Sequence, residues 1–203
     1  MLLDADESHL VLMDYQQSLL PAIHDGRSVL AHALQLARAA QLLGVPCTAT
    51  EHNPAGLGPT DVALAALVAK PIAKMSFSAA DQLVQRLRPP PKPAAGNARS
   101  LPRHLRKPHE PEPAGPVTIV LAGCEAHVCL LQTALELVED EFDVCVVTDA
   151  CGSRTERNRD AAFDRLAGAG CELVTTEMVL FEWLRSADHP AFKDVLTLVK
   201  STG

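Results

Sequence analysis

The stretch Val117-Thr-Ile-Val-Leu-Ala-Gly-Cys-Glu-Ala-His-Val-Cys129 decides how this chain folds. It begins as a continuous apolar run, which is typical of a buried parallel strand, and continues into leucines and alanines at helical spacing. Cys129 therefore falls in the first turn of a predicted helix, at the edge where open α/β sheets bind their ligands. The N-terminus of a helix favours a thiolate, so we predict a nucleophilic sulfur. The structural alternative is a small buried side chain.

The rest of the chain repeats this order of strand and helix. We predict strands at 9–14, 45–50, 72–74, 117–122, 143–148 and 171–175, and helices at 29–40, 61–68, 80–87, 130–138, 153–167, 178–184 and 192–199. A capping-box pattern, Ser153-Arg-Thr-Glu156, marks the start of one of these helices. Apolar strands that alternate with helices indicate a parallel sheet covered on both faces. The predicted fold class is α/β, with three α/β/α layers and a mainly parallel, Rossmann-like open sheet.

The composition is that of one globular domain. The chain has 203 residues, 47% of them apolar and 21% charged, which suits a single core. Only 3% are aromatic and the net charge is −7, so binding of nucleic acid is not expected. The six cysteines form no C-x-x-C pair, which favours a reducing compartment. The sequence shows no basic leader and no apolar run of membrane-spanning length, so we expect a cytoplasmic location and no membrane partner.

One segment departs from this pattern. We interpret residues 1–203 as a single domain with a proline-rich, basic insertion at about 88–116. Nine prolines lie between Arg88 and Pro116, and seven positive residues but no acid lie between Arg86 and Lys107. Such a segment buries too little surface to offset its ordering entropy, so the simplest interpretation is a solvated insertion. The functional alternative is an arm for an acidic partner, an anionic substrate or RNA.

Three predicted strands are followed by, or end in, a titratable or nucleophilic side chain. These residues are Asp14, Lys74 and Cys129. Because the carboxyl edges of parallel strands lie side by side, they can converge there. Asp14 would transfer a proton, Lys74 would hold a thiolate by charge, and helix amides would receive an oxyanion. Each residue also has a structural alternative. Asp14 would cap a turn, Lys74 would be the exposed end of a strand, and Cys129 would be a packing side chain.

Four motifs carry a resemblance to a known family. They are Leu12-Met-Asp-Tyr-Gln16, Lys74-Met-Ser-Phe-Ser78, Gly123-Cys-Glu-Ala-His-Val-Cys129 and Val147-Thr-Asp-Ala-Cys-Gly-Ser-Arg154. Together they resemble the isochorismatase-like cysteine hydrolases, and most closely the isochorismatase domain-containing subgroup. The resemblance runs from Leu10 to about Val199, apart from the insertion.

The resemblance implies a catalytic triad of Asp14, Lys74 and Cys129. It also implies an oxyanion hole made by the backbone N–H groups of Glu125 and Cys129, with a cis peptide bond before Glu125 that aims its N–H into the site. The expected reaction is attack of the sulfur on a carbonyl or related carbon, usually of a C–N bond in a small amide-like or anionic substrate. A thioester-like intermediate would then be hydrolysed.

Other implications concern ligands and partners. The loop after the second strand, Thr50-Glu-His-Asn53, lacks the histidine set of nicotinamidases in this family, so we expect no metal and no cofactor. Zinc held by Cys124, His127 and Cys129 is disfavoured because their side chains would diverge. Gln16 and Glu51 either line the substrate pocket or serve as structural hydrogen-bonding groups. Asp149 and Arg154 are expected to support a loop through an ion pair.

Two further expectations complete this interpretation. Proteins of this family are usually homo-oligomers, so a dimer or larger assembly is expected, with a small molecule as the substrate. The alternative function is a catalytically silent scaffold that keeps the fold without turnover.

Overall fold

The computed structural model describes residues 2–88 and 118–200. The insertion expected at about 88–116 therefore lies outside the described residues, apart from Arg88. The strands are β1 (Ser8–Met13), β2 (Cys47–His52), β3 (Ile72–Lys74), β4 (Thr118–Gly123), β5 (Asp143–Val147) and β6 (Glu172–Val174). The α-helices are α1 (Gly26–Leu43), α2 (Pro54–Leu57), α3 (Val62–Ala65), α4 (Ala80–Leu87), α5 (Leu131–Glu139), α6 (Glu156–Gly168), α7 (Thr176–Leu184) and α8 (Phe192–Lys200).

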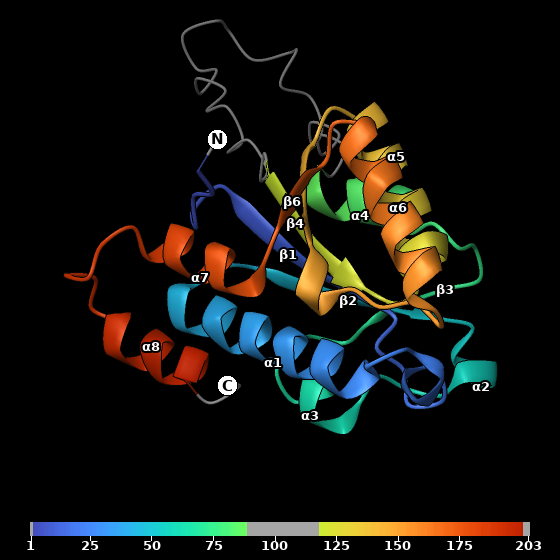
Figure 1. The fold of residues 1–203 in the computed structure, drawn as a ribbon, viewed down its shortest axis with the longest axis horizontal. Helices are drawn as coiled ribbons and strands as arrows, with labels where there is room; N and C mark the ends of the chain where they lie inside the picture. The colour runs from blue at the N-terminus through green and yellow to red at the C-terminus, as the bar shows by residue number, and fades with distance from the viewer. Residues whose placement is uncertain (1, 89–117, 201–203) are drawn as a thin grey trace, which may run out of the picture.

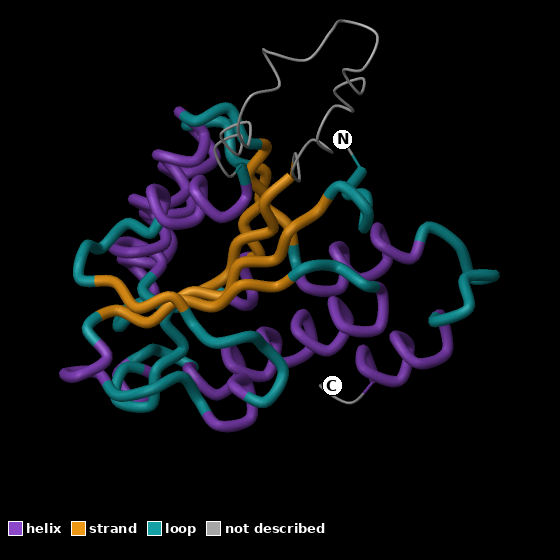
Figure 2. Tube along the Cα trace, turned by 180° about the vertical axis from the view of Figure 1, so that it is seen from behind, coloured by secondary structure: helices purple, strands orange, loops and turns teal. Residues whose placement is uncertain are grey.

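The six strands form one sheet in the order β3-β2-β1-β4-β5-β6, and every neighbouring pair is parallel. Helices α1, α3, α7 and α8 cover one face, and α4, α5 and α6 cover the other (Figures 1 and 2). The predicted three-layer α/β/α fold is confirmed. The strands at the centre, β1 and β4, are buried along almost their whole length, as expected for strands covered on both faces.

The carboxyl edge of the sheet depends on a glycine at the end of β4. A Cβ atom on Gly123 would lie 2.5 Å from the Met13 Cβ atom, closer than side-chain atoms can approach. Glycine thus lets the last residues of β1 and β4 lie against each other, in register. The Cys124 N–H donates to the Met13 carbonyl at 3.0 Å. The chain therefore leaves β1 and β4 from adjacent points.

Three local predictions need correction. The helix expected at 130–138 is preceded by a π-helical turn, Ala126–Leu130, so Cys129 lies in that turn and not in the first turn of α5. The loop after β2 contains the short helix α2. Helix α6 begins with Thr155 as its N-cap, whose hydroxyl accepts from the Asn158 N–H, while Ser153 lies outside the helix. No helix of the described ranges is long and apolar enough to cross a membrane.

Candidate active site

Asp14 lies directly after the end of β1 and is completely buried. Its backbone has a positive φ of 56°, which aspartate tolerates better than most residues. One carboxylate oxygen, Oδ1, accepts from the Thr50 hydroxyl at 2.6 Å, and the other, Oδ2, accepts from the Lys74 ammonium at 2.8 Å. Thr50 was missed by the sequence prediction, since a threonine inside a strand carries no signal of its own. The carboxylate is therefore held from two sides.

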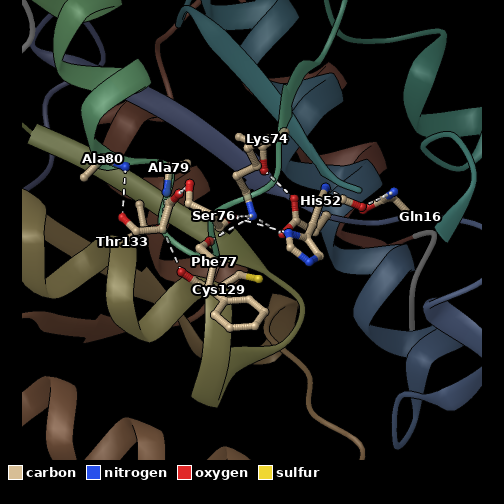
Figure 3. A network of polar contacts seen from close by, with 12 residues as sticks. Gln16, His52, Lys74, Ser76, Phe77, Ala79, Ala80, Cys129 and Thr133 are labelled. Carbon is tan, nitrogen blue, oxygen red and sulfur yellow. Dashed lines mark hydrogen bonds and ion pairs between the residues drawn. The ribbon is translucent and has the colours of Figure 1, made fainter. Parts of the chain in front are cut away.

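Lys74 is the last residue of β3, and its side chain is also withdrawn from solvent. Besides Asp14, its Nζ atom donates to the carbonyls of Phe77 at 2.9 Å and Ser76 at 3.4 Å (Figure 3). An ammonium has three N–H donors, so all of them have partners. A buried charge persists only when it is paired and hydrogen-bonded in this way.

Cys129 lies in the π-helical turn and is 6% exposed. The Thr133 hydroxyl donates to its carbonyl at 2.7 Å and accepts from the Ala79 N–H at 3.0 Å (Figure 3). Thr133 thus ties the turn to the start of α4, a role that the sequence prediction missed. Single π-helical turns are often found at functional sites.

The thiol does not have the depressed pKa that we predicted. The pKa of Cys129 is raised to about 12, chiefly by burial. The Asp14 carboxylate contributes to this rise by charge and hydrogen bonding, whereas the Lys74 ammonium acts in the opposite direction. The prediction of a resting thiolate is therefore wrong, because desolvation outweighs the favourable charge of Lys74. The raised pKa favours the protonated thiol over the thiolate at neutral pH.

The peptide bond between Cys124 and Glu125 is cis, as the resemblance implied. The following residue, Ala126, donates its N–H to the Gly152 carbonyl at 2.7 Å, and the Gly152 N–H donates to Gly123 at 3.2 Å. The loop between β4 and Cys129 is therefore tied by backbone hydrogen bonds to the segment that follows β5.

Two side-chain contacts strengthen this connection. The Glu125 carboxylate accepts from the Arg154 backbone N–H at 3.1 Å and from Arg154 Nε at 2.9 Å. The His127 Nδ1 atom lies 3.0 Å from the Ser153 hydroxyl. We call residues 152–154 the clamp, because each of them bonds to the loop that carries Cys129.

Asp149 and Arg154 do not pair with each other; the expected ion pair that supports a loop is made by Arg154 with Glu125. Asp149 Oδ1 instead accepts from the N–H and hydroxyl of Thr176, each at 2.8 Å. It thereby holds the start of α7. Each residue supports a different segment, because the strand β5 that precedes them lies between β4 and β6.

Gln16 and Glu51 are both occupied by structural contacts. The Gln16 amide donates to the carbonyls of His52 and Gly58 and accepts from the His52 N–H, at 2.7–3.0 Å. Glu51 accepts from the N–H and hydroxyl of Thr60 at 2.7 and 2.8 Å. These contacts favour the structural alternative for both residues: they hold the loop that follows β2.

The cysteines and histidine around the turn do not form a metal site. Cys124 is completely buried and its pKa is raised by that burial. Within residues 2–88 and 118–200, no group of three or more histidine, cysteine, aspartate or glutamate side chains is arranged to hold a metal ion.

Comparison with solved structures shows the same fold in several proteins. The MAR1 ribonuclease of Caenorhabditis elegans is 29% identical, with a TM-score of 0.81 over 98% of this chain and 92% of that one. YcaC of Pseudomonas aeruginosa, solved with hexane-2,5-diol and covalent acrylamide, is 25% identical, with a TM-score of 0.78 over 98% of this chain and 93% of that one. YcaC of Escherichia coli, described as an octameric hydrolase of unknown specificity, is 25% identical, with a TM-score of 0.74 over 99% and 97% of the two chains.

Sequence comparison identifies the family. Isochorismatase domain-containing protein 2 of Danio rerio is 34% identical over 95% of this chain and 86% of its own length. Isochorismatase domain-containing protein 2A of Mus musculus is 32% identical over 96% of this chain and 84% of its own length. The family model of the isochorismatase domain matches residues 8–178. The chain therefore belongs to the isochorismatase family of hydrolases.

Proposed function

We propose that this protein is a cysteine hydrolase that cleaves the C–N bond of a small amide-like substrate through Asp14, Lys74 and Cys129, without a metal ion or cofactor. The observation that carries the proposal is the buried ion pair of Asp14 and Lys74, both of which act on the Cys129 thiol. Withdrawing an ion pair from water is costly. Here the ion pair lies beside the Cys129 thiol, whose proton has to be removed in the reaction.

In the first step, Cys129 Sγ attacks the carbonyl carbon and its proton passes to an Asp14 oxygen. The electron pair of the carbonyl bond moves to oxygen. Lys74 stabilises the negative charge that develops on sulfur. We assign the backbone N–H groups of Glu125 and Cys129 as donors to the oxyanion, with the clamp as the support of the Glu125 peptide.

When the oxyanion collapses, the C–N bond breaks and the leaving amine takes the proton from Asp14. A thioester on Cys129 remains. Asp14 then removes a proton from a water molecule that attacks the thioester. The sulfur leaves, regains that proton and releases the carboxylic acid. A protonated resting thiol suits this order of steps, since Asp14 is then free to accept its proton.

Gln16 and Glu51 contribute indirectly in this mechanism. Both hold the loop after β2, and the first residue of that loop, Asn53, donates its N–H to the Lys74 carbonyl at 2.8 Å. We therefore assign them as residues that position β3 and its terminal lysine. The covalent acrylamide of the P. aeruginosa relative supports covalent chemistry in this group of proteins.

A panel of small amides, nitriles and esters tests the mechanism. Cys129→Ala is expected to lower turnover by at least about 10³-fold, whereas the control Cys171→Ala, which removes another buried thiol, leaves it unchanged. Mass spectrometry of the quenched wild-type reaction should find the acyl group on the peptide that contains Cys129. If the wild type accepts none of these compounds, the catalytically silent scaffold becomes the better interpretation. Full activity of Cys129→Ala would instead reject Cys129 as the nucleophile.

The rival activity is cleavage of RNA, because one relative is named a ribonuclease. The net charge of −7 does not favour binding of a polyanion. Cleavage of RNA by the wild type, lost in Cys129→Ala, would replace the amide with a phosphodiester as the substrate.

We also propose a homo-oligomer and a cytoplasmic location. The octameric state of the E. coli relative supports the assembly. Light scattering on the purified protein should give a mass of at least two chains, and a monomer mass would contradict it. The cysteine usage supports the location, which is checked by fractionation of cells.

A further inference from the structure

The short loop after Lys74 places apolar side chains in solvent beside the site. Met75 is 71% exposed and Phe77 is 50% exposed, although most large apolar residues of the described chain are buried. Phe77 is the more informative of the two, because its own carbonyl accepts from Lys74 Nζ at 2.9 Å. In Figure 3 its ring extends from this carbonyl toward the Cys129 sulfur.

The position of the Phe77 ring is held by further contacts. The His52 ring packs against it, with 5.3 Å between ring centroids and a tilt of 35°. The Ser76 hydroxyl donates to the Ser78 carbonyl at 2.7 Å, and His52 Nδ1 lies 3.3 Å from the Ser76 carbonyl. A loop tied down in this way offers a fixed apolar wall, in contrast to an exposed aromatic residue on a free loop.

The charges at the site balance one another. Lys74 is paired with Asp14 at 2.8 Å, and Arg154 with Glu125 at 2.9 Å. Lys74 has no donor left, and the guanidinium of Arg154 is bound to a carboxylate. Among the described residues that contact the triad or the Glu125 peptide, no cation remains without an acidic partner. A carboxylate on the substrate would therefore meet an apolar wall and two cations that are already paired.

We infer that the substrate is an uncharged amide with an apolar acyl chain, and that Phe77 determines this specificity by contacting the chain. This inference rests on the proposed function, because it assumes that the carbonyl carbon of the substrate lies beside Cys129. An apolar pocket gains about 0.8 kcal/mol for each methylene group that it buries. A charged end of the same chain loses its hydration without finding a partner.

Two probes of equal length test the inference by binding, independently of turnover. Hexanamide ends in a methyl group, and adipic acid monoamide carries a carboxylate in its place. Calorimetric titration of the full-length Cys129→Ala variant, which should not turn the probes over, is expected to show at least about tenfold tighter binding of hexanamide. Equal or tighter binding of the monoamide, or no binding of either probe, would overturn the inference.

Two matched variants test Phe77. Phe77→Ala is expected to weaken hexanamide binding about tenfold and to leave acetamide, which has no chain to pack, unaffected. Phe181→Ala is the control, since Phe181 is an exposed aromatic residue on α7, and it should change neither affinity. An equal loss for acetamide and hexanamide in Phe77→Ala would mean a structural role and overturn the assignment. A preference for hexanamide without Cys129-dependent turnover would leave the substrate class intact and reject the hydrolase mechanism.

Discussion

Cys129 and Cys145 are two buried thiols with the same raised pKa and different surroundings. The pKa of each is raised to about 12, chiefly by burial and in part by a neighbouring carboxylate. For Cys145 this is Glu172, whose Oε2 lies 3.6 Å from the sulfur. Cys145 even borders a cavity of about 470 Å³. Among the described residues, no ammonium acts on it as Lys74 acts on Cys129, and its place in the middle of β5 engages its backbone in the sheet.

The difference shows what makes a thiol a candidate nucleophile in this protein. The raised pKa does not separate the two cysteines, and the cavity lies beside Cys145, which is not the candidate nucleophile. Cys129 is set apart by a base and a cation that are already paired, and by a turn at the carboxyl edge of the sheet. Negative charge on its sulfur would be stabilised as it forms, whereas the described charged groups that act on Cys145 are carboxylates.

The largest expected effect comes from replacing the carboxylate beside each thiol with an amide. Asp14→Asn removes the proton acceptor, and turnover of the amide substrate should fall by about 10²–10⁴-fold. Glu172→Gln is the matched change beside Cys145 and should alter turnover less than about twofold. Steady-state kinetics on both variants measures the contrast. Similar losses in the two variants would remove the distinction between the thiols.

The next effect concerns the Lys74 ammonium, which acts on the Cys129 thiol. Lys74→Met leaves the Asp14 carboxylate buried without its partner, and the free energy of unfolding should fall by about 3–5 kcal/mol. Arg154→Met breaks a pair whose guanidinium side chain is 60% exposed, and should cost about 0–1 kcal/mol. Urea denaturation gives both values. The double variant of Asp14→Asn and Lys74→Met should regain part of the loss, and additive losses would contradict the coupling.

The smallest expected effect is that Cys129 and Cys145 do not differ in ionisation before substrate binds. With a pKa of about 12 for both sulfurs, neither should be ionised at about pH 7, and thiolate should increase only as the pH rises toward 12. The ultraviolet absorbance of the thiolate, taken as the difference between the wild type and each of Cys129→Ala and Cys145→Ala, measures this. A thiolate signal at neutral pH from Cys129 alone would show that its proton has already left and that Asp14 is not its acceptor.

Much of the fold could be predicted from local sequence. Continuous apolar runs such as 117–122 allow only a strand covered on both faces, and the helical spacing after each run supplies the cover. The same reasoning brought Asp14, Lys74 and Cys129 to one edge of the sheet, since parallel strands end on the same side. The cis peptide bond before Glu125 came from the resemblance alone, because no local pattern of residues announces it.

The remaining features were decided by contacts between distant segments. The pKa of Cys129, the hydrogen bond from Thr50 to Asp14 and the clamp at 152–154 all depend on which strands become neighbours. The sequence by itself determined the elements and the edge at which they end, because apolar periodicity is a local property. Only the tertiary structure decided that the thiol is protonated and that every nearby charge is paired. Desolvation and hydrogen bonding depend on the surroundings of a group and not on its place in the chain.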